Sequence, residues 1–513
     1  MTSCITAAWL LTLGASLQPP ITRRKAALSR HASTDEALLA AYRAEIAPDA
    51  DDAWWREFVE TSERPPRPAV RCVDAAAAAA LRASADCEEI PWARGRGYWL
   101  STDERPSRRV AHVTGAFYVQ EAAAMVAVAA LLHGEALDRR IVAIDACAAP
   151  GGKTIQLATA LRDAGADAVV LANEPSSSRL GALVANAVRC GVGPWLRCTR
   201  TTGAKLFAAL PRECADLILL DAPCSGDTLA RREGRGLAKH LRSQPDAGAV
   251  AELAAIQMDL LRTAWPCLKL GGALVYSTCS LRPREDEAVV NAFLRDLDDA
   301  VIEDLAGLAG DGAMLRLWPQ THDTAGFFAA KLRKGGKCTV AAAPAGADDD
   351  VADAARAYLR DAWGVASVAA AVPASSTLVG RGENLWLAPA APPLAGLKYE
   401  RTGAKLAGAL KVRGKAVPLA RALRTGNVRV THEFATTLGA AVDAARRAVL
   451  DDVAALAYLR GDDVDAPAAL AAPVGGQCLV QHGERVLGLA KVLKGGRLKN
   501  QLPRECTRRD LAF

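Results

Sequence analysis

Two short stretches of the sequence place cysteine where a thiol could do covalent chemistry. Residues 221–226 have the sequence Asp-Ala-Pro-Cys-Ser-Gly, and residues 276–280 have the sequence Tyr-Ser-Thr-Cys-Ser. Each stretch follows an apolar run that is typical of a buried strand. Ligands of parallel α/β sheets bind beyond the carboxyl ends of the strands. We therefore expect Cys224 and Cys279 to project into one site.

A third stretch, residues 145–154, ends one predicted strand and begins a predicted helix. Its small residues let a ligand approach the backbone, and the helix N-terminus offers unpaired N–H groups. It is neither a P-loop nor a dinucleotide Gly-x-Gly-x-x-Gly motif. Glu174 ends the next predicted strand, where a carboxylate can accept two hydrogen bonds from a ribose diol. These residues indicate a nucleoside cofactor and leave its identity open.

The elements that position these residues follow one another in a regular order. Predicted strands alternate with predicted helices from Arg140 onward, which favours a doubly wound α/β sheet with helices on both faces. The predicted strands are 141–146, 168–173, 195–200, 215–220 and 272–277, and the predicted helices are 154–164, 178–189 and 249–267. Residues 314–318 and 326–333 predict a further antiparallel hairpin at the edge of this sheet.

The sequence divides into five predicted segments. They are a targeting or disordered segment (1–34), a small α+β N-terminal region (35–114), a catalytic domain (115–335), a linker with one helix (336–376) and a basic C-terminal domain of short strands (377–513). Residues 398–429 contain nine Lys or Arg and one acid. Five arginines between 94 and 109 lie among Trp92, Tyr98 and Trp99, which suits RNA binding. A solvated face with partly buried rings is the alternative interpretation.

Composition limits the class of protein. A chain of 513 residues is too long for one hydrophobic core, and its formal net charge of +6 is compatible with a polyanionic partner. The 13 cysteines form no Cys-x-x-Cys pair and no cluster with zinc-ligand spacing, so we expect neither a disulfide scaffold nor a metal site. We expect no membrane span, because no run is long and apolar enough.

The first 34 residues contain no Asp or Glu, and a largely apolar run from 6 to 17 precedes several basic residues. This pattern favours a targeting sequence, for a plastid reached through the secretory route or, second, for a mitochondrion. A disordered tail or a wrongly chosen start codon is the alternative. The protein would then be nuclear, nucleolar or cytoplasmic.

Together, residues 145–154, 221–226 and 276–280 resemble the RsmB/Nop/Sun family of S-adenosylmethionine-dependent RNA cytosine-C5 methyltransferases. Residues 117–122, similar to the helix before the family's catalytic domain, and the acidic segment 283–289 extend the resemblance. The C-terminal stretches 488–491 and 497–505 resemble the bacterial 16S ribosomal RNA members. The resemblance implies a Rossmann-like methyltransferase sheet and a C-terminal PUA-like domain.

The resemblance also implies roles for single residues. Cys279 is the expected nucleophile that adds to cytosine C6, so that C5 can take the methyl group. Cys224 is expected to assist as a base or in product release, and Asp221 to bind the N3/N4 edge of the base. Lys153 is a candidate for the positive charge that favours a thiolate. The residues expected at the S-adenosylmethionine site are Cys147, Ala148, Ala149, Pro150, Gly151, Gly152, Lys153, Glu174, Arg179 and Asp221.

Two departures from the family pattern and two alternative functions complete the prediction. The family usually has an acid near the adenine after the third strand, where this chain has Thr-Arg-Thr-Thr at 199–202. It also usually has a second glycine shortly after the first cysteine motif, a region where Arg231 or Arg232 could contact RNA. Small-subunit rRNA is the preferred substrate and a monomer the expected state. The alternatives are a tRNA methyltransferase and an RNA-binding ribosome-assembly factor with dispensable activity.

Overall fold

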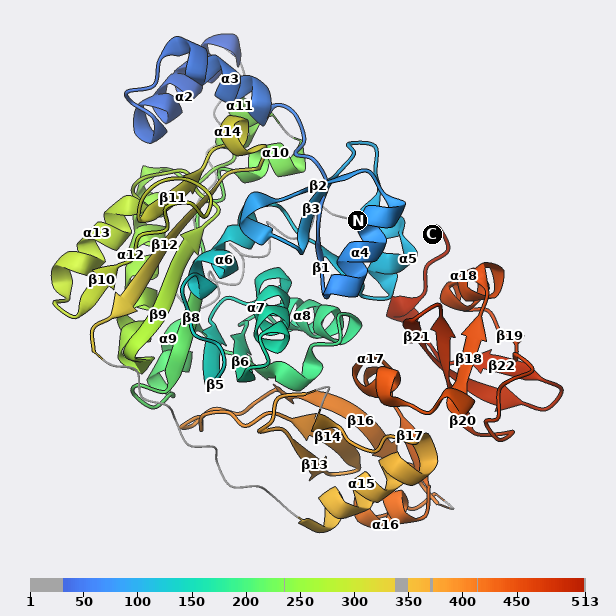
Figure 1. The fold of residues 1–513 in the computed structure, drawn as a ribbon. Helices are drawn as coiled ribbons and strands as arrows, with labels where there is room; N and C mark the ends of the chain where they lie inside the picture. Colours follow the sequence, from blue (N-terminus) through green and yellow to red (C-terminus); the bar gives the residue numbers. More distant parts are fainter. Residues whose placement is uncertain (1–30, 235, 337–348, 370–371, 413, 512–513) are drawn as a thin grey trace.

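The computed structural model describes residues 31–511 except 235, 337–348, 370–371 and 413. Most of the predicted targeting segment 1–34 therefore lies outside the described residues, and its destination stays a prediction. Part of the predicted linker 336–376 also lies outside the described residues. Figure 1 shows a central sheet, with the N-terminal elements along one side and two β-rich modules formed by the C-terminal part of the chain.

The central sheet has the predicted doubly wound core. Five parallel strands lie in the order β9-β8-β5-β6-β7. They are β5 (Arg140–Asp145), β6 (Asp167–Asn173), β7 (Leu196–Thr199), β8 (Ala215–Asp221) and β9 (Leu268–Thr278). The chain runs outward from β5 to β7, then returns to the other side of β5 with β8. The strand order thus reverses beside β5, where such sheets bind their ligands.

An antiparallel edge completes one side of this sheet, as the sequence predicted. Strand β12 (Phe327–Lys334) pairs with β9, and β11 (Met314–Leu317) pairs with β12. Strand β10 (Ala300–Ile302) pairs with the other end of β12.

Helices cover both faces of the sheet, so the strands are buried on both sides. The helices on one face are α6 (Val126–Leu132), α7 (Gly152–Asp163) and α8 (Ser177–Arg189). Those on the other face are α9 (Gly203–Ala208), α12 (Ala247–Ala264) and α13 (Glu287–Asp296). The short helices α10 (Leu229–Glu233), α11 (Leu237–Leu241) and α14 (Pro319–His322) lie beside the N-terminal helices in Figure 1. None of the described helices is long and apolar enough to cross a membrane.

The N-terminal region begins with two helices, α2 (His31–Ile46) and α3 (Asp52–Ser62). Asp51 separates them, because its side chain accepts a hydrogen bond from the Trp54 N–H and caps α3. A four-stranded antiparallel sheet of order β2-β3-β1-β4 follows. Its elements are β1 (Ala69–Cys72), α4 (Ala75–Ser84), β2 (Cys87–Glu89), β3 (Gly97–Leu100), α5 (Val110–Val113) and β4 (Phe117–Val119). Residues 117–122 were likened to the helix before the family's catalytic domain. They instead begin with strand β4, and the helix before the central sheet follows as α6.

The aromatic rings of this region are structural. Trp92, Tyr98 and Trp99 are buried at 5%, 2% and 6% exposure. Arg96 pairs with Asp163, and Arg109 pairs with Glu104. The rings therefore offer no stacking platform for RNA bases, and the alternative of buried rings describes the structure better. Composition shows that arginines and aromatic residues share one segment, but it does not show whether their side chains share one face of the domain.

The C-terminal part contains two further modules. The first has the sheet β13-β14-β16-β17 with the helices α15, α16 and α17. Its elements are α15 (Asp349–Trp363), β13 (Thr377–Arg381), β14 (Asn384–Ala388), β16 (Ala404–Ala409), α16 (Leu419–Arg424), β17 (Val428–Val430) and α17 (His432–Leu438). Helix α15 lies in the segment interpreted as a linker. Its residues Ala352, Ala355, Leu359 and Trp363 form one apolar face, buried in this core.

The second module is a five-stranded sheet of order β18-β20-β21-β22-β19. Its elements are β18 (Arg447–Leu450), α18 (Asp452–Arg460), β19 (Val464–Asp465), β20 (Gln477–His482), β21 (Arg485–Leu493) and β22 (Arg497–Asn500). The Gln477 side chain joins the two modules, because it bonds both the N–H and the carbonyl of Val430.

A short strand connects the C-terminal part to the central sheet. Strand β15 (Arg401–Thr402) pairs antiparallel with β7 and so extends that sheet. Gly403 follows with φ of +72°, and a Cβ there would lie 2.0 Å from the Leu387 carbonyl oxygen. Only glycine fits this turn from the central sheet into β16.

Candidate active site

The structure brings the two predicted cysteines together. Cys224 lies just beyond the end of β8, and Cys279 directly follows β9, its parallel neighbour. Their Sγ atoms are 3.1 Å apart, and both side chains are half-buried. Two thiols at this distance can share a proton and act on neighbouring atoms of one substrate.

The surroundings of Cys224 favour its protonated form. The hydrogen bond to Cys279, together with burial and the nearby Glu285 and Asp221, raises the pKa of Cys224 well above its usual value. Either thiol can donate in the hydrogen bond between the two sulfur atoms. A protonated Cys224 suits the roles that the resemblance implies, with Cys279 as the nucleophile.

Lys153 supplies positive charge at the cysteine pair. Its Nζ lies 2.7 Å from Asp221 Oδ2 and 4.9 Å from the ring centroid of Phe327. Burial acts to lower the pKa of Lys153, but Asp221 and the sulfur of Cys279 raise it overall, so the ammonium form persists. A cation beside a reactive cysteine is the environment that a thiolate nucleophile requires.

Asp221 is fixed between the two strands that carry the cysteines. Its Oδ1 accepts a hydrogen bond from Ser277 Oγ at 3.0 Å, while Oδ2 pairs with Lys153. The side chain remains 28% exposed, so it can also reach a ligand. Its position is compatible with the predicted contact to the base edge.

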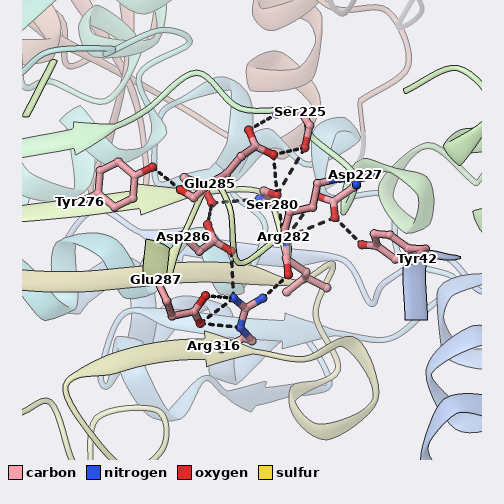
Figure 2. Close-up of polar contacts among 12 residues, drawn as sticks. Tyr42, Ser225, Asp227, Tyr276, Ser280, Arg282, Glu285, Asp286, Glu287 and Arg316 are labelled. Carbon is pink, nitrogen blue, oxygen red and sulfur yellow. Dashed lines mark hydrogen bonds and ion pairs between the residues drawn. The ribbon is translucent and has the colours of Figure 1, made fainter. Parts of the chain in front are cut away.

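Glu285 lies beneath both cysteine loops and joins them (Figure 2). Its carboxylate accepts hydrogen bonds from the Ser225 N–H at 2.8 Å, from the Ser225 hydroxyl and from Ser280 Oγ at 3.0 Å. Gln257 Nε2 donates to the same carboxylate at 3.1 Å. Ser225 and Ser280 each follow one of the cysteines, so one buried carboxylate fixes the relative position of the two loops.

The N-terminal helix α2 contacts the same loops. The Tyr42 hydroxyl donates to Asp227, and Asp227 accepts from the Leu281 N–H at 3.2 Å. Arg282 forms an ion pair with Glu45, also on α2. Below them, the Arg316 guanidinium pairs with Asp286 and Glu287 (Figure 2). Residues of the N-terminal helix α2 and of the edge strand β11 therefore hold the segment that follows Cys279.

The turn 147–153 has the features of a cofactor turn. Gly151, with φ of +107°, precedes α7, and the Ala149–Pro150 peptide is cis. Arg179 connects this turn to Glu174: it pairs with the Glu174 carboxylate at 3.1 Å and donates to the Ala149 carbonyl at 2.7 Å. The thiol of Cys147 stays protonated, because burial and the charges of Asp145 and Asp221 raise its pKa. That the backbone of Cys147, rather than its thiol, contacts the cofactor stays a prediction.

The donor set of this turn fits a cofactor with hydroxyl and ammonium groups. Glu174 is buried at the end of β6 and accepts from the Ser176 N–H. Asp145, at the end of β5, accepts from Thr154 Oγ1 at 2.6 Å through Oδ2. Its Oδ1 is buried and has no hydrogen-bond partner in the described part of the chain. A buried acceptor without a donor beside a small-residue turn suits a polar ligand such as S-adenosylmethionine.

The family usually has an acid after the third strand, here β7. In this chain a carboxylate from the C-terminal part, Glu400, lies next to that region. Asn173 bonds Thr199 Oγ1 and the Thr201 N–H, and so orders the region after β7. The Glu400 N–H donates to the Cys198 carbonyl, and the Glu400 carboxylate lies 3.7 Å from the Arg200 guanidinium. An acid two hundred positions away in sequence could not have been predicted here from local residues.

Other site residues were also missed by sequence reasoning. They are Glu285, Gln257, Phe327, Asp227 and Tyr42. The acidic segment 283–289 pointed to Glu285 through the resemblance, but not to its contacts. One of Arg231 and Arg232 was expected to contact RNA. Arg231 is buried at 5% exposure and bonds Asp323 and the Arg64 carbonyl, whereas Arg232 is exposed and its contact with RNA stays a prediction.

Comparison with known proteins identifies the family. Three family profiles match in the order of the modules: the N-terminal domain of 16S rRNA methyltransferase RsmF (41–122), 16S rRNA methyltransferase RsmB/F (131–333) and the methyltransferase RsmF PUA domain (446–508). The ribosomal RNA small subunit methyltransferase F of Aeromonas salmonicida is 34% identical over 83% of this chain and 86% of its own. The chain belongs to the RsmF family of 16S rRNA methyltransferases.

Further RsmF relatives agree with this membership. The ribosomal RNA small subunit methyltransferase F of Escherichia coli O1:K1 / APEC is 36% identical over 82% of this chain and 84% of its own. The solved structure of PH0851 matches with a TM-score of 0.51 at 23% identity, over 61% of this chain and 70% of that one, which supports the fold.

RsmF membership confirms the resemblance, the predicted methyltransferase fold with its C-terminal PUA domain, and S-adenosylmethionine as the expected cofactor. The PUA match covers the second C-terminal module, with β18 to β22.

Proposed function

We propose that the chain transfers a methyl group from S-adenosylmethionine to C5 of a cytosine in small-subunit ribosomal RNA. The observation that carries this proposal is the pair of thiols 3.1 Å apart at the ends of β8 and β9, next to the Lys153–Asp221 pair. Cytosine C5 is too weak a nucleophile to react unaided, so a chain of this family needs a thiol that activates it.

In the proposed reaction, the sulfur of Cys279 adds to C6 and its electron pair passes through the ring to C5. S-adenosylmethionine supplies the methyl cation equivalent. Asp221 accepts a hydrogen bond from the base edge and Lys153 stabilises negative charge that develops on the ring. C5 then loses its proton to a water molecule or to the Cys224 thiolate, the electron pair of the C5–H bond re-forms the C5–C6 double bond, and the C6–S bond breaks so that Cys279 leaves as the thiolate. Cys224 is positioned to exchange a proton in this second stage.

The test measures 5-methylcytosine directly. The wild-type chain is incubated with 16S rRNA and labelled S-adenosylmethionine, in parallel with Cys279→Ala and with Cys87→Ala, a half-buried cysteine outside the site. We expect product from the wild type and from Cys87→Ala, and none from Cys279→Ala. Absence of 5-methylcytosine from the wild type would contradict the proposal. Transfer RNA in the same assay tests the alternative substrate.

A further inference from the structure

Two residues of the loop after β8 hold the backbone that carries Cys279. Strand β9 ends directly before Cys279, so side chains must support the backbone beyond it. Thr228 Oγ1 donates to the Cys279 carbonyl at 2.7 Å, and its methyl group packs against Gly326, where a Cβ would lie 2.9 Å from it. Asp227 accepts the Leu281 N–H through both carboxylate oxygens, at 3.2 and 3.3 Å. These contacts of Asp227 and Thr228, the loop brace, fix the segment that carries the thiol.

The Asp227 half of the loop brace depends on the N-terminal helix α2 (Figure 2). Among the described residues, the Tyr42 hydroxyl is the one side-chain donor to Asp227. Asp227 is 1% exposed and Tyr42 is 4% exposed, so solvent does not reach this contact. Burial and the charge of Asp227 raise the pKa of Tyr42 well above its usual value, so the hydroxyl keeps the proton that it donates. A buried carboxylate that loses its donor is left unsatisfied, which is costly.

The side chain of Leu281 is held by the same part of the chain. It is 1% exposed and belongs to the apolar cluster that contains Tyr42 and Ile46 of α2 and Phe58 of α3. Its neighbour Arg282 adds an ion pair with α2 and lies 5.2 Å from the centroid of the Tyr42 ring. Both the backbone and the side chain two positions after the nucleophile therefore rest on the N-terminal helices.

We propose that Tyr42 is a positioning residue for Cys279, which it holds through Asp227, and that helix α2 is thereby a working part of the active site. The inference rests on the proposed function, since it takes Cys279 as the nucleophile. Lys153 and Cys224 can stabilise a thiolate only while the loop keeps the Cys279 sulfur beside them. A reacting group displaced by about 1 Å can lose about 100-fold in rate. Tyr42 is buried and acts on the reaction through Asp227, not on the RNA.

The first test compares Tyr42→Phe with Tyr458→Phe in the full chain. The control also removes a buried hydroxyl, which donates to the Leu489 carbonyl at 2.7 Å in the core of the PUA domain. With saturating S-adenosylmethionine, Tyr42→Phe should lower kcat for 5-methylcytosine formation about 10-fold and leave KM for RNA unchanged. Tyr458→Phe should keep the wild-type kcat. Thermal unfolding of both variants measures how much stability each hydroxyl contributes.

A second readout requires no methyl transfer. Alkylation of Cys279 by iodoacetamide, followed by peptide mass spectrometry, reports the fraction of thiolate at that position. At pH 7 we expect alkylation about 3- to 10-fold slower in Tyr42→Phe than in wild type or Tyr458→Phe, because the sulfur is no longer held beside Lys153. At pH 10, where thiols ionise in most surroundings, the difference should shrink.

A pair of substitutions at Thr228 tests the other half of the loop brace. Thr228→Val keeps the methyl group against Gly326 but removes the hydroxyl that bonds the Cys279 carbonyl. Thr228→Ser keeps the hydroxyl. We expect Thr228→Val to lower kcat about 10-fold and Thr228→Ser to retain most of it. Equal losses in the two variants would assign the effect to packing and contradict the loop brace.

Equal kcat and equal alkylation rates in Tyr42→Phe and Tyr458→Phe would overturn the proposal. A raised KM for RNA with an unchanged kcat would do the same. A lower kcat that merely follows a lower thermal midpoint, with unchanged alkylation, would reduce Tyr42 to a structural residue and also overturn it.

These results are separable from the proposed function. If the wild type forms no 5-methylcytosine but Tyr42→Phe slows alkylation of Cys279, the function fails and the positioning role stands. If the wild type methylates RNA and the two tyrosine variants behave alike, the positioning role fails and the function stands.

Discussion

The cysteine loops and the groove between the two C-terminal modules (the basic track, lined by Lys405, Arg429, Lys491 and Lys499) arrange their polar groups in opposite ways. In the loops, Glu285 accepts four hydrogen bonds from within the chain, and Asp221 is held on both oxygens. In the track, Lys405, Lys491 and Lys499 have no acidic partner among the described residues. Chemistry needs reacting groups fixed to a fraction of an ångström, so the loops are satisfied internally. A surface that grips a polyanion must instead leave its charge free.

This difference predicts that substitutions in the two regions impair different properties of the protein. Changes in the loops should slow catalysis and destabilise the fold, whereas changes in the track should weaken RNA binding and leave the fold intact. Four variants test the comparison.

Cys224→Ala should have the largest effect. If Cys224 acts in the second stage, turnover falls by about 100-fold or more, and the adduct between Cys279 and the RNA accumulates. A protein–RNA complex that survives denaturant should appear on a gel. Cys224→Ala/Cys279→Ala is the control and should give no complex. Rapid turnover by Cys224→Ala without a trapped complex would assign Cys224 a different role.

Glu285→Gln should slow methylation about 10- to 100-fold at saturating RNA, because an amide nitrogen then faces donors from Ser225 and Ser280. The free energy of unfolding should fall by about 1 to 3 kcal/mol, the usual cost of losing hydrogen bonds to a buried charged group. Urea unfolding and single-turnover rates measure the two effects. Glu252→Gln, at an exposed position of α12, is the matched control. Equal rates for the two variants would show that Glu285 does not position the loops.

Asp145→Asn should change the pH dependence of stability. Burial raises the pKa of Asp145 to about 7, with Asp221 acting in the same direction, whereas an unfolded Asp titrates near 4. The folded chain therefore binds an extra proton between these values, and this contribution to stability is lost as pH rises through about 7. The wild type should lose roughly 2 kcal/mol more than Asp145→Asn between pH 5 and pH 8. If the urea midpoints of the wild type and of Asp145→Asn change equally between pH 5 and pH 8, this prediction is refuted.

K405E/K491E/K499E should have the smallest effect on the fold. The three side chains have no ion pair to lose, so the free energy of unfolding should stay within about 0.5 kcal/mol of wild type. Thermal and urea unfolding check this expectation. A loss as large as that of Glu285→Gln would mean that these lysines support the structure and would remove the contrast between the two regions.

The sequence predicted what local pattern determines. The strands that carry Cys224 and Cys279 are short apolar runs with polar residues at their ends, and parallel pairing then brings the two thiols together. The closing hairpin was predictable for the same reason. The contacts that hold the loops were not, because the partners are distant: Tyr42 lies 185 positions from Asp227, and Glu285 lies 60 from Ser225.

Two failures have a clearer physical cause. Interleaved arginines and rings around Trp92 suggested an RNA surface, but composition does not report which face a side chain occupies, and the rings are buried. The helix in the 336–376 segment was predicted, but not its packing. Its apolar stripe, Ala352, Ala355, Leu359 and Trp363, makes the helix amphipathic, but such a pattern does not indicate which sheet the stripe packs against.

The pairing of β15 with β7 makes the chain difficult to divide. A polypeptide cut after the catalytic domain would present β7 as a bare sheet edge, with unpaired N–H and carbonyl groups open to association with other copies. The C-terminal half thus acts as a cap on the enzyme's own sheet, in the manner of an added strand. The same two residues, Arg401 and Thr402, therefore cover the edge of the catalytic sheet and help to orient the C-terminal half.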